Sequence, residues 1–113
     1  MVRARKITDN MAIAAAHSLA GYAEKRGINT ENIVPNMNET SVFPEEAADV
    51  AMQAIKDGVA RIEISREEAF AKAEADIKYS RDMTQKLVDE GFIAPPPEDM
   101  MQQALAWAVQ QVS

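Results

Sequence analysis

The stretch Asp9–Arg26 constrains the fold most, because it has the pattern of a complete helix with both ends marked. Thr8 is a suitable N-cap, and Asp9 places an anion in the first turn, where the helix dipole favours one. Arg26 suits the last turn and Gly27 the position just after it. The sequence therefore predicts a helix over residues 9–26. Apolar side chains recur along one face of it at spacings of three or four, namely Ile7, Met11, Ala15, Leu19 and Tyr22.

An irregular connection, "INTENIVPNMNETSVF", follows this helix and is rich in Asn and Thr. Ile33 and Val34 are expected to be extended, because the residue before Pro35 avoids the helical region. Pro44 suits the first position of a second helix, which Gly58 ends. Its expected apolar face consists of Ala47, Val50, Ala51, Ala54 and Ile55. Residues 59–64 are predicted to form a short extended link.

Ser65 and Glu68 form a capping box, in which each side chain accepts the backbone N–H of the other residue. This signal predicts a third, long and exposed helix from there to about Asp89, with Gly91 as its stop. A proline linker then precedes a fourth helix. One face of that helix carries Met101, Leu105, Ala108 and Val112, with Met100, Ala104 and Trp107 beside it. The fold class is thus mainly α, with about four helices and one Asn- and Pro-containing connection.

The composition limits how such helices could be stabilised and what they could bind. Seven methionines and only 5% aromatic residues predict a thin core, since buried apolar surface contributes about 25 cal/mol per Å². A partner surface is therefore expected. The net charge of −6 argues against nucleic acid, whose phosphates are bound by clustered Lys and Arg. The basic residues near the start are too few to reverse this balance.

Other classes of protein are excluded by what the sequence lacks. There is no cysteine, and hence no disulfide framework, thiolate nucleophile or cysteine-based metal site. No apolar run has the length of a membrane span, and no signal-peptide pattern opens the sequence. A cytoplasmic protein is expected.

The only histidine, His17, is the one candidate for a general base. A catalytic histidine needs an orienting carboxylate and a reacting partner, which the sequence does not supply, so a structural or surface role is expected. The adjacent acidic pairs point about 100° apart on a helix and do not converge on one site. Their places at helix ends explain them as dipole partners and solvated surface. These pairs are Glu45/Glu46, Glu67/Glu68 and Asp89/Glu90.

The segment "NTENIVPNMNETS" is rich in oxygen ligands, but it lacks the acidic spacing and central glycine of a calcium loop. No glycine-rich phosphate loop is present. The methionines are typical of a promiscuous binding groove, and more often of core or interface filler. The residues by themselves therefore predict no catalytic, cofactor-binding or metal-binding residue.

Two phrases in register resemble the malic enzymes. Val2-Arg3-Ala4 and Ile7-Thr8-Asp9-Asn10-Met11-Ala12, followed by an alanine-rich helix, resemble the segment after the nicotinamide-binding core of that family. Asn10 stands where Glu is commoner. Ile33-Val34-Pro35 and Gly58-Val59-Ala60-Arg61 are similar to a later phrase of the family. The loop "PNMNETSVF" is more polar than in many bacterial members, and the part from Ser65 on looks like an extension that only some members carry.

The resemblance implies the C-terminal helical part of a larger α/β enzyme. Residues 1–64 would be the helical end of its nicotinamide-binding domain, and residues 65–113 a helical extension in subunit contact. Malic enzymes oxidise and decarboxylate malate to pyruvate and CO₂ with NAD or NADP and Mg²⁺ or Mn²⁺. In the family, the catalytic tyrosine and lysine, the metal carboxylates and the glycine fingerprint lie upstream of the matching region, so no site residue and no cofactor are expected here.

Three functions remain open at this point. The first is a malic enzyme segment, inactive alone, whose partners are the missing upstream catalytic domains and a further copy in a homo-oligomer. The second is a free-standing helical module that dimerises through a Met/Ala surface. The third, with least support, is a small enzyme that uses His17.

Overall fold

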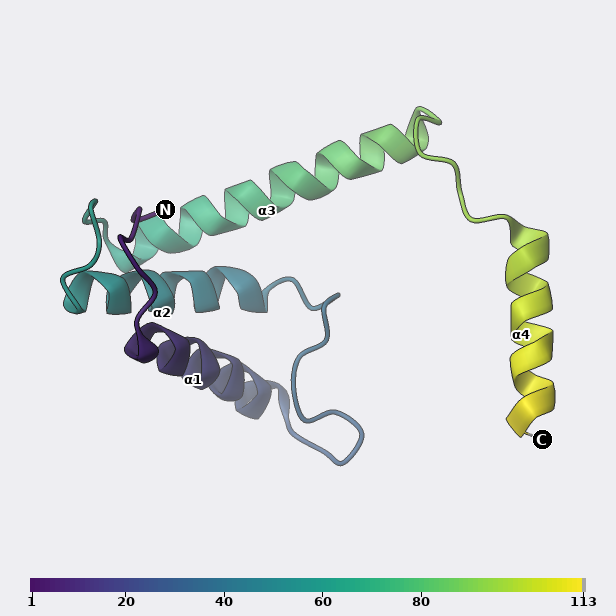
Figure 1. Ribbon diagram of the computed structural model, residues 1–113, viewed down its shortest axis with the longest axis horizontal. Helices are drawn as coiled ribbons and strands as arrows, with labels where there is room; N and C mark the ends of the chain where they lie inside the picture. Colours follow the sequence, from purple (N-terminus) through teal and green to yellow (C-terminus); the bar gives the residue numbers. More distant parts are fainter. Residues whose placement is uncertain (113) are drawn as a thin grey trace. The chain divides into compact units, whose positions relative to one another are not determined.

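The computed structural model describes the backbone of residues 1–112 and the side chains of residues 1–111. Its helices are α1 (Asp9–Arg26), α2 (Val42–Lys56), α3 (Arg66–Asp89) and α4 (Glu98–Val112), in that order (Figure 1). The described residues hold no strand, only an isolated bridge between Asn29 and Asn32. The expected mainly α fold is confirmed. The bridge closes a turn just before Ile33 and Val34, which form a bend where an extended piece was expected.

Local signals set the ends of α1 and α3 as expected. The Thr8 hydroxyl accepts the Met11 N–H at 3.2 Å, which caps α1. At the start of α3, the Glu68 N–H donates to Ser65 Oγ at 3.1 Å and the Ser65 N–H to Glu68 Oε2 at 2.8 Å. Gly27 and Gly91 follow α1 and α3 with φ of 98° and 76°, a backbone region that glycine enters without steric cost.

The second helix begins at Val42, two residues before the expected first position, Pro44. Pro44 still lies in the first turn, where backbone N–H groups have no partner within the helix, so its missing N–H costs nothing. Val42 is almost fully buried and anchors this earlier start. At the other end, Gly58 has a φ of 69°. The N–H groups of the two residues after it reach back to the Ala54 carbonyl at 3.1 and 3.2 Å.

The chain divides into two units, Met1–Tyr79 and Ser80–Ser113, which are described separately. In the first unit, α1 packs against α2. The N-terminal segment pairs with the link after α2, since the N–H groups of Arg61 and Ile62 donate to the Val2 carbonyl at 3.0 and 3.2 Å. The sequence analysis placed a domain boundary between residues 64 and 65 of a larger enzyme, and this boundary remains a prediction.

The core of the first unit is small and built largely from alanine. Its buried cluster comprises Val2, Met11, Ala48, Ala51, Ala54, Val59 and Ala69. Small side chains let helices approach closely but each contributes little buried area. Ile7, predicted on the apolar face of α1, is 82% exposed. Ile7 precedes the N-cap Thr8 and lies outside the helix, so it does not share the apolar face of α1.

The second unit contains the end of α3, the linker and α4. No side chain is buried among its described residues 80–111. The Ile93 N–H bonds to the Leu87 carbonyl at 3.1 Å and closes the turn after α3. Large apolar side chains of α4 are exposed to solvent, including Met100, Met101, Leu105, Trp107 and Val109. Val112, expected on the same face, has a side chain outside the described part. No described helix is long and apolar enough to cross a membrane.

Candidate functional site

One open groove in the first unit gathers polar side chains from α1, α2 and the start of α3. Its volume is about 660 Å³. His17, Tyr22 and Arg26 come from α1, whereas Glu45 and Asp49 come from α2 and Arg66 from α3. The groove thus brings together ionisable side chains from three helices of the first unit.

Arg66 holds the start of α3 to α2. Its Nη2 atom lies 2.6 Å from Glu45 Oε2 and 2.9 Å from Asp49 Oδ1, and its Nε donates to the same Asp49 oxygen at 3.1 Å. The second oxygen of Asp49 accepts the Ser18 hydroxyl of α1 at 2.7 Å. Arg66 donates hydrogen bonds to the carboxylates of Glu45 and Asp49, and these bonds, the one to Glu45 first, raise the pKa of Arg66. One carboxylate therefore links all three helices.

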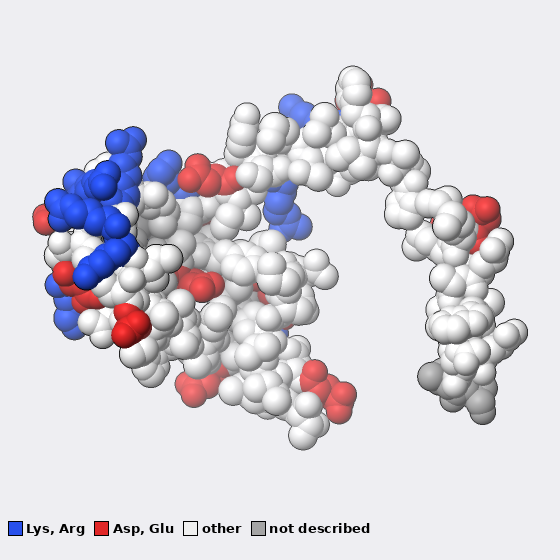
Figure 2. Space-filling model, viewed as in Figure 1, with Lys and Arg blue, Asp and Glu red and all other residues white. Residues whose placement is uncertain are grey.

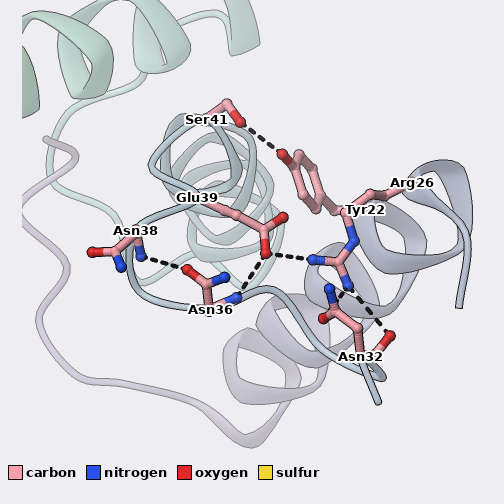
Figure 3. A network of polar contacts seen from close by, with 7 residues as sticks. All are labelled: Tyr22, Arg26, Asn32, Asn36, Asn38, Glu39 and Ser41. Atoms are coloured by element: carbon pink, nitrogen blue, oxygen red, sulfur yellow. Dashed lines mark hydrogen bonds and ion pairs between the residues drawn. The ribbon is translucent and has the colours of Figure 1, made fainter. Parts of the chain in front are cut away.

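A second network fixes the irregular connection to the end of α1 (Figure 3). The Arg26 guanidinium forms an ion pair with Glu39 and donates to Asn32 Oδ1 at 2.7 Å. Glu39 also accepts the Asn36 N–H at 3.0 Å. This backbone hydrogen bond, followed by the one from Arg26, lowers the pKa of Glu39. The hydroxyls of Tyr22 and Ser41 lie 2.7 Å apart, so α1 contacts both ends of the loop's last turn.

A third network, centred on the Asp57 carboxylate, lies at the opposite end of α1. Asp57 Oδ2 accepts the Thr8 hydroxyl at 2.5 Å, and Asp57 Oδ1 accepts side-chain amides of Asn10 at 3.2 Å and Gln53 at 2.7 Å. The Thr8 hydrogen bond is the main cause that lowers the pKa of Asp57. Asp57 thus holds the start of α1 against the end of α2.

His17 lies exposed on α1 at the edge of the groove. Among the described residues no hydrogen bond joins it to a carboxylate, and Glu45 and Asp49 bind Arg66. The arrangement of an oriented general base is therefore not assembled around it.

One residue of each adjacent acidic pair has a structural role of its own. Glu45 binds Arg66, Glu68 caps α3, and Asp89 accepts the Gln85 amide at 2.8 Å. Within the described residues, no group of three or more His, Cys, Asp or Glu side chains could hold a metal ion.

Side chains of the oxygen-rich loop, residues 29–41, form hydrogen bonds with the loop's own backbone. Asn29 Oδ1 accepts the Glu31 N–H at 3.0 Å, and Asn36 Oδ1 accepts the Asn38 N–H at 2.8 Å. Asn commonly stabilises turns in this way, because its side chain can bond to the backbone two residues further on. The Asn-rich composition is therefore explained by loop geometry.

Sequence reasoning missed the two arginines as organising residues. Arg26 was interpreted only as a residue suited to the last turn of its helix, and Arg66, between Ser65 and Glu68 of the capping box, was given no role. In the sequence, Glu39 lies 13 residues from Arg26, and Asp49 lies 17 residues from Arg66. No local spacing rule connects residues so far apart.

The fold and its polar contacts define a mainly α-helical protein, and comparisons with known proteins show which proteins it is similar to. The crystal structure of the Entamoeba histolytica malic enzyme matches with a TM-score of 0.90 and 53% identity, over 99% of this chain and 23% of that one. A malic enzyme structure from Pyrococcus horikoshii matches with a TM-score of 0.70 and 35% identity, over 79% of this chain and 20% of that one. No family model matches.

A curated relative agrees with these structures. The bifunctional malic/malolactic enzyme of Bacillus subtilis is 34% identical over 71 residues, which are 63% of this chain and 17% of that enzyme. The resemblance to the malic enzymes is thus confirmed, and the chain is similar to a helical part of them. It spans about a fifth of the length of these relatives. The Entamoeba match also reaches past Ser65, the part expected in only some members.

Proposed function

We propose that this chain is a segment of a malic enzyme that contributes packing and subunit contact, while other parts of the enzyme carry the chemistry. The match to the Entamoeba enzyme over 99% of the chain carries this proposal. The whole enzyme oxidises malate with NAD or NADP, decarboxylates the intermediate and releases pyruvate and CO₂. Its Mg²⁺ or Mn²⁺ supplies Lewis-acid polarisation of the substrate oxygens.

The groove supports a structural role for the segment. Its carboxylates are engaged by Arg66, and its other strong cation, Arg26, is engaged by Glu39. We place the metal ligands elsewhere in the enzyme, upstream of the matching region, as the resemblance to the family implies. The networks of Arg26 and Arg66 instead hold α1, α2, α3 and the loop in fixed positions. An element that supports an active site needs such fixed positions.

Apolar surface around the first unit supports a contact with further protein. A second groove, of about 530 Å³, lies between the N-terminal segment and α2 and is lined by Met1, Met11, Phe43 and Val50 among others. In the loop, Ile33, Val34 and Met37 are exposed. Large exposed apolar patches mark interaction sites, and we assign these to the remaining domains of the enzyme.

The source DNA upstream of the Met1 codon tests this function. We expect an open frame of several hundred codons that encodes a glycine fingerprint, a lysine and metal carboxylates. A stop codon with a ribosome-binding site just upstream would contradict it. The free-standing helical module, which the exposed apolar side of α4 favours, would then replace it.

A further inference from the structure

The open groove between α1, α2 and the start of α3 has more hydrogen-bond donors than its own acceptors satisfy. Both oxygens of Asp49 already accept hydrogen bonds, one of them from Arg66, which also donates to Glu45. His17 and Lys25 line the groove too, and among the described residues neither forms a hydrogen bond or an ion pair. The groove therefore has donors left for a molecule that is rich in acceptors.

The two guanidinium groups in the groove wall add to this surplus. Arg66 donates through Nε and Nη2 to its carboxylates. Arg26 donates through Nη1 to Glu39 and through Nη2 to Asn32 (Figure 3), and its Nε is buried without a hydrogen-bond partner among the described residues. Buried donors without a partner are uncommon, and a water or an ion outside the chain is one usual explanation.

Gly21 leaves one part of the groove wall bare. It lies in the interior of α1, where glycine costs stability relative to alanine because it loses more backbone freedom on folding. A Cβ at Gly21 would meet nothing within 4 Å, so packing among the described residues does not require a glycine there. His17 and Lys25 lie four residues before and after it, about one helical turn to either side. A group held between these two side chains would lie over the backbone of Gly21.

The charges of the groove favour a small molecule over a covering protein surface. The centres of protein interfaces are poor in charged residues, whereas Lys25, Asp49 and Arg66 all line this groove. The apolar surfaces that suit protein contact lie elsewhere, in the loop residues 33–37 and in the second groove. The volume of about 660 Å³ lies within the range of roughly 300–1,000 Å³ that is typical of small-molecule sites.

We propose that this groove binds a small organic anion, whose carboxylate or phosphate group lies over Gly21 between His17 and Lys25. An oxyanion accepts several hydrogen bonds at once, and those from a charged donor are stronger than neutral ones. Two aromatic side chains of the lining, Tyr22 and Phe70, are half-buried and offer apolar surface to the rest of the molecule. The inference goes beyond the proposed packing role and does not depend on it.

An NMR titration of the isotope-labelled chain at constant ionic strength tests the site. Phenyl phosphate and benzoate each join a ring to one kind of oxyanion, and benzyl alcohol carries the ring without a charge. At least one of the two anions should shift the amide signals of His17, Gly21 and Lys25 with a dissociation constant in the millimolar range. The anion that binds more tightly then shows whether phosphate or carboxylate is preferred.

Three results of this titration would overturn the proposal. The first is that neither anion shifts the three amide signals, and the second is that benzyl alcohol binds as well as the anions do. The third is an equally large shift in the N-terminal segment, beside which Lys and Arg side chains gather (Figure 2). Such a shift would report a general attraction of anions to positive charge, without a site in the groove.

Two variants separate binding from folding. Lys25→Gln should weaken binding of the anion roughly fivefold, as expected for the loss of one exposed charge pair. Lys56→Gln is the matched control, since Lys56 is exposed at the end of α2 and does not line the groove, and it should leave binding unchanged. Gly21→Ala should raise the melting temperature, because alanine is favoured in helices and the methyl group meets nothing. It should nevertheless weaken binding at least as much as Lys25→Gln, because the methyl group takes the place of the anion.

Unchanged affinity of Gly21→Ala for the anion would overturn the proposal. None of these results bears on the upstream reading frame, so the malic enzyme proposal is judged separately.

Discussion

Arg26 at the end of α1 and Glu39 in the loop before α2 form an ion pair that sets the path of the irregular connection. Both side chains are only 22% exposed. Glu39 accepts a second hydrogen bond from the Asn36 N–H, so one carboxylate fixes both the loop's turn and its attachment to α1.

The first prediction concerns acid stability. Because the pKa of Glu39 is lowered in the folded chain, its ionisation stabilises the fold at any pH above the ordinary pKa of a glutamate. That contribution is lost as pH falls from there through the lowered pKa. Glu39→Gln should therefore be less stable than the unaltered chain at pH 7 and lose less stability between pH 6 and pH 3. Thermal unfolding followed by circular dichroism at both pH values measures this.

Glu31→Gln is the matched control for that experiment, since Glu31 lies exposed in the same loop. It should keep the pH dependence of the unaltered chain. If Glu39→Gln also follows the unaltered chain, the Arg26–Glu39 pair does not stabilise the loop.

The second prediction concerns the capping box. Ser65→Ala removes the acceptor of the Glu68 N–H and should lower the free energy of unfolding by about 1 kcal/mol. Ser65→Asp keeps an acceptor and should restore most of the loss. Urea unfolding followed at 222 nm measures both variants, and equal stability of Ser65→Ala and Ser65→Asp would show that the cap does not act.

The third prediction concerns the alanine core. Ala54 has no exposed surface, and Ala54→Leu should destabilise the fold by roughly 1–3 kcal/mol because a tightly packed core has no room for three more carbons. Ala71→Leu, at an exposed position of α3, is the control and should change the stability by less than about 0.5 kcal/mol. If the two variants unfold at the same urea concentration, the core around Ala54 is not tightly packed.

The ends of α1 and α3 could be predicted because they depend on neighbours in sequence. Thr8 and Ser65 cap through residues three positions away. The start of α2 was predicted wrongly because Pro44 tolerates several first-turn positions, and burial of Val42 decided among them.

The polar networks could not be predicted, since they join residues brought together only by packing. Asp49 meets both Arg66 and Ser18, which lie on two other helices. The sequence offers each arginine many acidic partners, and only the packed helices choose one. The family, in contrast, was recognised because whole phrases of it are kept in register between Val2 and Arg61.

The most direct measurement of the central claim is the activity of a chimera. The segment of the Entamoeba histolytica malic enzyme that matches this chain is replaced by residues 1–113, and malate-dependent reduction of the nicotinamide cofactor is followed at 340 nm. We predict that kcat/KM stays within about tenfold of the parent enzyme, a change of ~1.4 kcal/mol in transition-state stabilisation. An unrelated helical segment of the same length in that place should abolish activity. A chimera that folds with the parent's circular dichroism spectrum and melting temperature, yet reduces no cofactor, would contradict the claim.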